Sequence, residues 1–317
     1  MAKTDTKASL IWREVKRHRS VYLLMILPVA YFIIFRYFPI WHGQIAFRDF
    51  MPKIGIPELD TDRGIFNSAW IGFTHFRTFI NGEYFLELIR NTLMYSFGKL
   101  LVSVPAAILF AVMLFECSKP KLAKMVQTLA YLPHFLSWVI MYGILLSLLA
   151  PGDGVFNDII KAFGGDSVDF LNDTKTFPFI VILSDVWKEM GWSAIIFIAA
   201  LISIDPTLFE AAMVEGATAI QRVWYITLPS IRPVIVIVVL LRLGTVLDAG
   251  FHQIFILYSP AVYSVADIID TWVYRQGLLH FQFGLATAVG LFKGFIGMLL
   301  ILFSNWLVKR VSDSSLF

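Results

Sequence analysis

The stretch Glu210-Ala211-Ala212-Met213-Val214-Glu215-Gly216-Ala217 is a polar interval between two long apolar runs of the sequence. Asp205 and Pro206 precede it and predict a helix start, because an Asp side chain accepts hydrogen bonds from the free N–H groups of the first turn and proline fits the first helical position. The two alanines would let a partner surface approach this helix closely, with the two glutamates at its rim. The glycine then permits a sharp turn. We therefore expect a helix–turn–helix projection that makes a mechanical contact at a membrane face.

The composition of the 317-residue chain is that of an integral membrane protein. Hydrophobic residues make up 58% and charged residues 15%, and the mean hydropathy is +0.72, which is far outside the range of soluble globular proteins. Six apolar runs are each long enough to cross the roughly 30 Å hydrocarbon core as a helix. We therefore expect an all-α integral membrane protein with six transmembrane helices, at 21–38, 92–115, 126–149, 177–204, 234–256 and 285–308.

The charges in the loops predict the direction in which the chain crosses the membrane. Lysine and arginine gather before the first run, between the second and third runs, around the segment 205–232 and after the last run. Loops on the opposite side are longer and acidic. Because basic loops stay in the cytoplasm, we expect both termini and the segment 205–232 on that side. The expected organisation is a cytoplasmic amphipathic N-terminus (1–20), a membrane domain (21–308) that includes an external segment (39–85), and a cytoplasmic tail (309–317).

The fourth apolar run carries a stripe of ionisable residues. Asp185, Lys188, Glu189 and Trp192 are spaced so that they share one face of a helix. Charged groups are costly at membrane depth unless they are paired or hydrated, so this face is predicted to meet a water-filled pathway or the interior of the bundle. Carboxylates, amides and ammonium groups offer hydrogen-bond donors and acceptors to a polar substrate, and aromatic rings offer apolar faces to it. The candidate substrate-pathway residues are Asn91, Asp185, Trp187, Lys188, Glu189 and Trp192.

Two other interpretations of the stripe stay open at the level of the sequence. Asp185 and Lys188 could form an ion pair that only stabilises helix packing, or the stripe could act as an external gate. Lys188 and Lys293 would also suit an anionic substrate. Gly191 and Pro133 are expected to bend their helices.

Motifs for catalysis and for cofactor binding are missing from the chain. It has no Gly-x-x-x-x-Gly-Lys-Ser/Thr phosphate loop, so an ATP-driven process needs another subunit. Metal-binding and hydrolase motifs are absent as well, and the single Cys117 cannot form an internal disulfide. The formal charge of +3 excludes a strong nucleic-acid footprint. We expect neither an enzyme nor a cofactor or metal site in this chain.

Glu210-Ala211-Ala212 with Gly216-Ala217, followed by Ile226-Thr227-Leu228-Pro229, resembles the EAA loop of permease subunits from binding-protein-dependent ABC importers. The sequence departs from the family at Glu215, where aspartate is usual, and at Val223, where an aromatic residue is common. Three further stretches, 90–93, 131–134 and 185–192, resemble permeases of the carbohydrate branch that handle oligosaccharides and polysaccharide fragments. The resemblance extends over 90–309.

This resemblance implies a type I ABC importer permease in the bacterial cytoplasmic (inner) membrane. The EAA loop would form a coupling helix that sits in a groove of a cytoplasmic ATPase and transmits its closure. A second homologous permease, two ATPase subunits that bind ATP and Mg, and an extracytoplasmic solute-binding protein would complete the complex. The external segment would cap the entrance or receive the binding protein. The residues implied to dock on the ATPase are Glu210, Ala211, Ala212, Met213, Glu215, Gly216 and Ala217.

A stand-alone proton-coupled secondary transporter is the alternative from another functional class. Asp185, Glu189 and Asp248 would then relay protons through the membrane. Neighbouring genes for a second permease and a binding protein would favour the importer, whereas an isolated gene would favour the secondary transporter.

Overall fold

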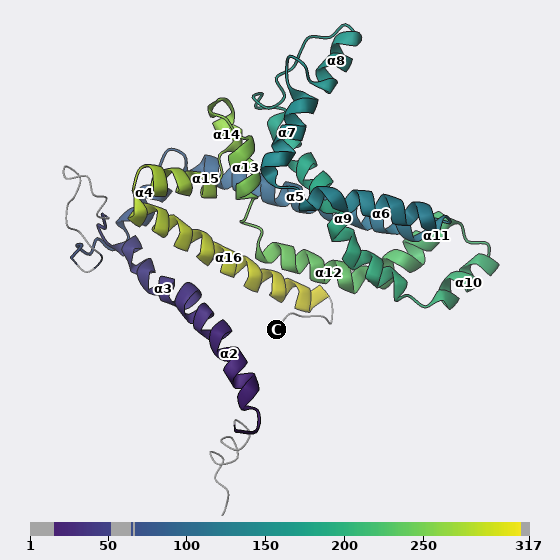
Figure 1. Ribbon diagram of the computed structural model, residues 1–317, viewed down its shortest axis with the longest axis horizontal. Helices are drawn as coiled ribbons and strands as arrows, with labels where there is room; N and C mark the ends of the chain where they lie inside the picture. The colour runs from purple at the N-terminus through teal and green to yellow at the C-terminus, as the bar shows by residue number, and fades with distance from the viewer. Residues whose placement is uncertain (1–15, 52–64, 66, 312–317) are drawn as a thin grey trace, which may run out of the picture. The chain divides into compact units, whose positions relative to one another are not determined.

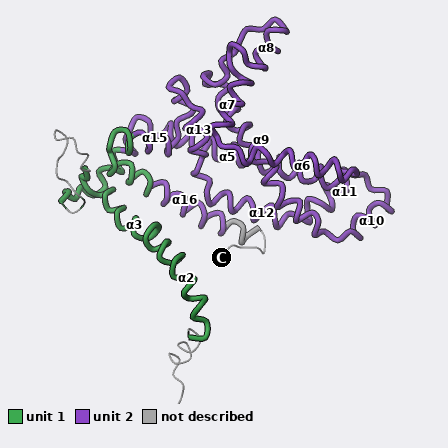
Figure 2. The backbone as a smooth tube through the Cα atoms, in the orientation of Figure 1, with its two compact units in different colours: residues 1–78, 276–291 green, residues 79–275, 292–317 purple. Residues whose placement is uncertain are grey.

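The computed structural model describes residues 16–51, 65 and 67–311, and the regular structure of these residues is helical apart from one isolated bridge (Figure 1). The predicted all-α class is therefore confirmed. Most of the expected amphipathic N-terminus lies outside the described residues, as do 52–64 and 66 of the external segment and 312–317 of the tail. The chain divides into two compact units, coloured separately in Figure 2: Met1–Thr78 with Gln276–Leu291, and Phe79–Arg275 with Phe292–Phe317.

The described part of unit 1 contains an unbroken helical run of 29 residues, Arg19–Phe47. Its segments are α2 (Arg19–Phe32), η1 (Ile33–Tyr37), α3 (Phe38–His42) and η2 (Gly43–Phe47). The helix extends past the predicted run at 21–38 because the next residues remain largely apolar and aromatic. Beyond it, Arg48 forms an antiparallel bridge with Trp70, and the ring of Phe47 stacks on Trp70 at 5.5 Å.

Unit 2 contains most of the helices of the described chain. They are α5 (Phe85–Phe115), α6 (Pro120–Phe135), α7 (Trp138–Leu149), α8 (Val155–Ala162), α9 (Phe177–Ile202), α10 (Pro206–Val214), α11 (Ala219–Arg222), η3 (Val223–Thr227), α12 (Leu228–Gly244), α13 (Phe251–Leu257), η4 (Pro260–Val262), α14 (Tyr263–Ala266) and α15 (Ile269–Tyr274). Three further elements run across a boundary between the units: α4 (Thr74–Ile80), η5 (Arg275–Leu279) and α16 (Phe283–Val311).

Within the described residues, four helices are long and apolar enough to cross a membrane, and six candidate spans result when each of two bent helix pairs counts as one. The predicted helix at 92–115 begins earlier than expected, at Phe85. The predicted run at 126–149 is a bent pair, because α6 and α7 meet at an angle of 109°. Ser137 lies at this break in an extended conformation and caps α7 by accepting from the Ile140 N–H.

The predicted helix at 234–256 is wrong in its C-terminal half. The helix continues from α11 through α12 but ends at Gly244, and a separate helix, α13, starts after Gly250. Gly250 has a φ of +90°, a conformation that side chains with a Cβ rarely adopt. The apolar run therefore contains a backbone break, at 245–250, that hydropathy does not reveal.

The core of unit 2 is built around α5 and α9. One apolar cluster joins them to α13 through Tyr95, Phe177 and Ile254, and a second joins them to α12 through Ala111, Phe197 and Ile231. Gly191 lies inside α9, which is continuous from Phe177 to Ile202. A Cβ on Gly191 would lie 2.6 Å from the carbonyl carbon of Ala130. The glycine therefore permits close approach of α9 to α6.

Candidate functional site

The segment 205–232 lies at one end of unit 2, where α10 projects beyond the long helices and α11 begins the helix that continues into α12 (Figure 1). Asp205 caps α10, because its side chain accepts from the Thr207 N–H at 2.9 Å, and Pro206 occupies the first turn. This hydrogen bond holds the pKa of Asp205 below its ordinary value. The cap therefore stays ionised at neutral pH, and its negative charge faces the positive end of the helix dipole.

The turn after α10 is fixed by backbone hydrogen bonds. Gly216 has a φ of +75°, its N–H donates to the carbonyl of Met213 at 3.1 Å, and the N–H of Ala217 donates to the carbonyl of Ala212 at 2.9 Å. This pair of bonds is the Schellman arrangement that ends a helix at a glycine. Thr218 then forms a capping box with Gln221 and starts α11. The angle between α10 and α11 is thus set by local sequence.

Most of the residues expected to dock on an ATPase lie on the surface of the protein. Glu210, Ala211, Met213, Glu215 and Gly216 are exposed, whereas Ala212 and Ala217 are half-buried. The neighbouring Val214 is 88% exposed, although it is apolar. Val223, where an aromatic residue is common in the family, packs against the cluster that holds Ala111 and Phe197. The segment therefore has a packed base and presents small, apolar and acidic groups at its tip.

A cavity of about 210 Å³ lies in unit 2, between α5, α9 and the break after α12. Five of its lining residues have ionisable side chains, namely Lys99, Asp185, Glu189, Arg242 and Asp248. Lys99 Nζ lies 3.4 Å from Asp185 Oδ1 and donates to the Ala249 carbonyl at 2.9 Å and to Gln253. A Cβ on Gly250 would overlap Lys99 Nζ, so Lys99 would have to shift, and the φ of +90° at this position favours glycine.

The other charged residues of the cavity are Glu189 on α9, Arg242 on α12 and Asp248 in the break that follows α12. Arg242 donates to the Ser193 hydroxyl at 2.7 Å, and Ser103 donates to Asp185 at 3.4 Å. Carboxylates, guanidinium and hydroxyl groups together offer both donors and acceptors to a polyhydroxylated ligand. The cavity can therefore bind hydroxyl-rich groups, and its residues do not form a nucleophile–base arrangement.

Lys188 does not pair with Asp185. Its side chain is 8% exposed and donates to the carbonyls of Pro133 (3.2 Å), His134 and Leu136 (2.8 Å). Its ammonium also lies 5.7 Å from the centre of the Trp138 ring. These carbonyls are at the C-terminal end of α6, where a cation satisfies acceptors that have no partner within the helix. Lys188 therefore holds the α6–α7 break against α9.

Glu189 and Trp192 both contact His134 of α6. Glu189 Oε2 lies 2.9 Å from His134 Nδ1, and the His134 and Trp192 rings stack with centroids 4.5 Å apart and planes at 2°. Trp192 is 45% exposed. Glu189 also lines the cavity, so His134 links Trp192 to one residue of the cavity wall.

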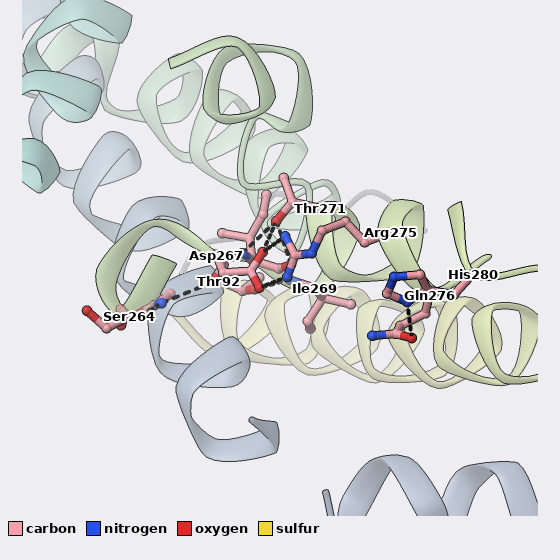
Figure 3. A network of polar contacts seen from close by, with 10 residues as sticks. Thr92, Ser264, Asp267, Ile269, Thr271, Arg275, Gln276 and His280 are labelled. Carbon is pink, nitrogen blue, oxygen red and sulfur yellow. Dashed lines mark hydrogen bonds and ion pairs between the residues drawn. The ribbon is translucent and has the colours of Figure 1, made fainter. Parts of the chain in front are cut away.

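Asn91 lies away from the cavity and is fully buried. Its amide donates to the carbonyls of Ser264 (3.2 Å) and Asp267 (3.0 Å), and its side-chain oxygen accepts from Arg90. Figure 3 shows the same loop held by Asp267, which accepts from Thr271 and Arg275, and by Thr92, which accepts from the Ile269 N–H at 3.1 Å. Asn91 thus fixes the segment between α14 and α15.

Of the six candidate pathway residues, Asp185 and Glu189 line the cavity and Trp192 lies beside Glu189 through His134. Asn91, Trp187 and Lys188 do not line it. Lys99 and Arg242 line it although the sequence did not place them in the pathway. The sequence does contain a signal for these two residues. Each is an ionisable residue inside an apolar run, and such residues usually face a polar interior.

Comparison with known proteins gives consistent matches along the chain. A family model described as "Binding-protein-dependent transport system inner membrane component" matches residues 89–314. The chain is 39% identical over 319 residues to the polygalacturonan/rhamnogalacturonan transport system permease protein YteP of Bacillus subtilis (strain 168), with 98% of this chain and 96% of that protein covered. It is 38% identical over 303 residues to protein LplB of the same organism, with 96% and 92% covered.

A solved structure matches over nearly the whole chain. The matching subunit belongs to a bacterial ABC transporter involved in the import of the acidic polysaccharide alginate. The TM-score is 0.85 at 38% identity, with 95% of this chain and 99% of that chain covered.

Proposed function

Because this chain belongs to the family of binding-protein-dependent transport system inner membrane components, we propose that it forms half of the pathway by which an ATP-driven importer moves oligosaccharides derived from an acidic polysaccharide. The chain is the permease of an ABC importer, a multi-pass inner-membrane subunit without catalytic activity of its own. This assignment replaces the stand-alone proton-coupled transporter that the sequence left open.

The substrate class is supported by one observation, the similarity to two transporters of acidic glycans. The chain is 39% identical to a polygalacturonan/rhamnogalacturonan permease and 38% identical to a subunit of an alginate importer. Both similarities extend over at least 95% of the chain, so they include the cavity as well as the EAA loop. We assign to this chain an oligosaccharide that carries uronate groups.

The pathway is assigned to the charged cavity of unit 2. Asp185 and Glu189 provide acceptors for sugar hydroxyls, Arg242 provides donors, and Trp192 offers an exposed aromatic face beside Glu189. Lys188 and Asn91 act as positioning residues, because each side chain binds backbone carbonyls. The cavity of one permease is small for an oligosaccharide, and a second homologous permease would supply the remaining wall.

The coupling site is assigned to α10 and the following turn. Two ATPase subunits would bind ATP and Mg and would receive Met213 and Val214, which are apolar side chains exposed on this chain. An extracytoplasmic solute-binding protein would deliver the substrate on the opposite side. The basic loops support a topology in which the EAA loop and both termini face the cytoplasm.

The substrate assignment predicts selective stimulation of ATP hydrolysis. We expect oligogalacturonates or alginate oligosaccharides, presented by the cognate binding protein, to raise ATP hydrolysis by the reconstituted complex several-fold. Neutral malto-oligosaccharides of equal length are expected to leave it at the rate without substrate. Hydrolysis would be measured in proteoliposomes that contain both permeases and the ATPase. Stimulation by the neutral series alone would contradict the proposed substrate class.

A further inference from the structure

The segment 205–232, which contains the EAA loop and is called the EAA segment below, is joined in sequence to α9 and α12. It also contacts a third helix, α5. Arg222, the last residue of α11, places its guanidinium nitrogen 3.2 Å from Glu116 Oε2. Glu116 is the residue that caps the C-terminal end of α5, and 106 positions of sequence separate the two partners. Neither side chain is freely solvated, since 18% of Arg222 and 25% of Glu116 is exposed.

Because Glu116 lies at the C-terminal end of a helix, its carboxylate needs the positive charge of Arg222. The C-terminal end of a helix carries partial negative charge, so a carboxylate there is unfavourable unless a cation neutralises it. Arg222 is that cation, and it also lies near the Ala217 carbonyl, 3.4 Å from its oxygen. One guanidinium therefore links the end of α5 to the turn that follows Gly216.

An aromatic contact lies next to the ion pair. The ring of Phe115, the last residue of α5, lies 5.8 Å from the ring of Phe209 on α10. The ion pair and the aromatic contact hold both α10 and α11 to the same end of α5. Arg222 is also followed directly by Val223, which packs against the cluster containing Ala111 and Val112 of α5.

The middle of α5, around Lys99, lines the cavity. Lys99 pairs with Asp185 and lies on the same helix as Glu116. At a rise of about 1.5 Å per residue, the two positions are about 25 Å apart along the helix axis. A displacement of the EAA segment can therefore reach the cavity through α5 as well as through α9. Packed helices transmit such displacements because close-packed cores deform little.

We propose that Glu116 and Arg222 are positioning residues that couple α5 to the EAA segment, so that ATPase closure changes the Lys99–Asp185 wall of the cavity. This inference rests on the proposed docking of the EAA segment. It adds a second route of transmission, through a helix to which the segment is not directly joined in sequence.

The test is a charge exchange in the complete reconstituted importer, read as substrate molecules transported per ATP hydrolysed. Glu116→Arg places two cations together, and we expect the transport ratio to fall about tenfold, a typical size for a coupling free energy between sites. The double variant Glu116→Arg/Arg222→Glu restores opposite charges and is expected to recover most of the ratio. Glu116→Gln, which keeps the shape of the side chain, is expected to show an intermediate loss.

The matched control is Asp158→Asn, which removes the acid from the exposed Lys161–Asp158 pair within α8. It is expected to leave the ratio unchanged. An unchanged ratio in Glu116→Gln and Glu116→Arg, or a charge-exchanged variant as impaired as Glu116→Arg, would overturn the proposal. Thermal stability measured on the same samples separates coupling from folding, because a purely structural pair would lower stability without changing the ratio.

The same samples separate this inference from the docking on which it rests. A cross-link from Met213→Cys to the ATPase reports docking directly. If that cross-link forms while the Glu116 variants keep a normal ratio, only the α5 route fails. If it does not form in the complex with an unaltered Glu116, the docking assignment itself fails.

Discussion

Gly216→Leu is expected to abolish the substrate-stimulated part of ATP hydrolysis while the permease still inserts into the membrane. The φ of +75° at this position is strained for a residue with a Cβ, at a cost of about 1–2 kcal/mol. No atom lies within 4 Å of the Cβ site in the described structure, so the effect arises from the backbone and not from a clash. Relief of the strain would break the hydrogen bonds that end α10 and would change its angle to α11. Hydrolysis with and without substrate measures the loss.

Gly164→Leu is the matched control for this variant. Gly164 ends α8 with a φ of +82° and an open Cβ site, and Gly164 and Gly165 donate to Lys161 and Ile160 in the same pattern of hydrogen bonds. The local strain is therefore similar, but the position is far from the EAA segment in sequence and on the loop expected outside the cell. Stimulation is expected to persist in Gly164→Leu. Equal effects of the two variants would show that backbone strain, and not docking, causes the loss.

Asp185→Ala is expected to reduce transport more than any other single change in the cavity. It leaves Lys99, with 10% of its side chain exposed, without its acidic partner at 3.4 Å. Removal of one member of a buried ion pair costs about 3–5 kcal/mol, and it also removes an acceptor from the cavity wall. Uptake of labelled oligosaccharide per assembled complex measures the effect.

Two further variants show whether the loss comes from the pathway or from folding. Asp185→Asn keeps the size of the side chain and an acceptor, so it is expected to assemble normally and still to transport slowly. Trp192→Ala removes an exposed aromatic face and leaves the Lys99 pair intact, so a smaller loss with normal assembly is expected. Normal uptake by both of these variants would exclude the cavity as the substrate pathway.

The sequence predicted the EAA segment well because its structure is determined locally. Asp205, Pro206 and Gly216 each act on the backbone within a few residues, and the structure has the helix start and the turn where these residues stand. The long apolar runs were equally informative about the existence of helices. Hydropathy averages over many residues, so it missed the break at 245–250, between the end of α12 at Gly244 and the start of α13 after Gly250.

The roles of the polar membrane residues were harder to predict. The spacing of Asp185, Lys188 and Glu189 placed them correctly on one helix but did not reveal their partners. Lys188 binds carbonyls at the end of α6 and Asp185 pairs with α5, and these contacts depend on how three helices pack. Asn91 has the right chemistry for sugar recognition, but its amide binds backbone carbonyls more than 170 positions away. Residue type alone could not distinguish these uses.

The most direct test of the account is a cross-link at the tip of the EAA segment during turnover. Met213 is 54% exposed, and Cys117 is the single cysteine of the chain, so Met213→Cys in a Cys117→Ser background gives one reactive site. A thiol-specific cross-linker is predicted to join this site to the ATPase subunit, with a yield that changes between nucleotide-free and ATP-bound complexes. A complex that imports substrate while this site never cross-links to the ATPase would contradict the account.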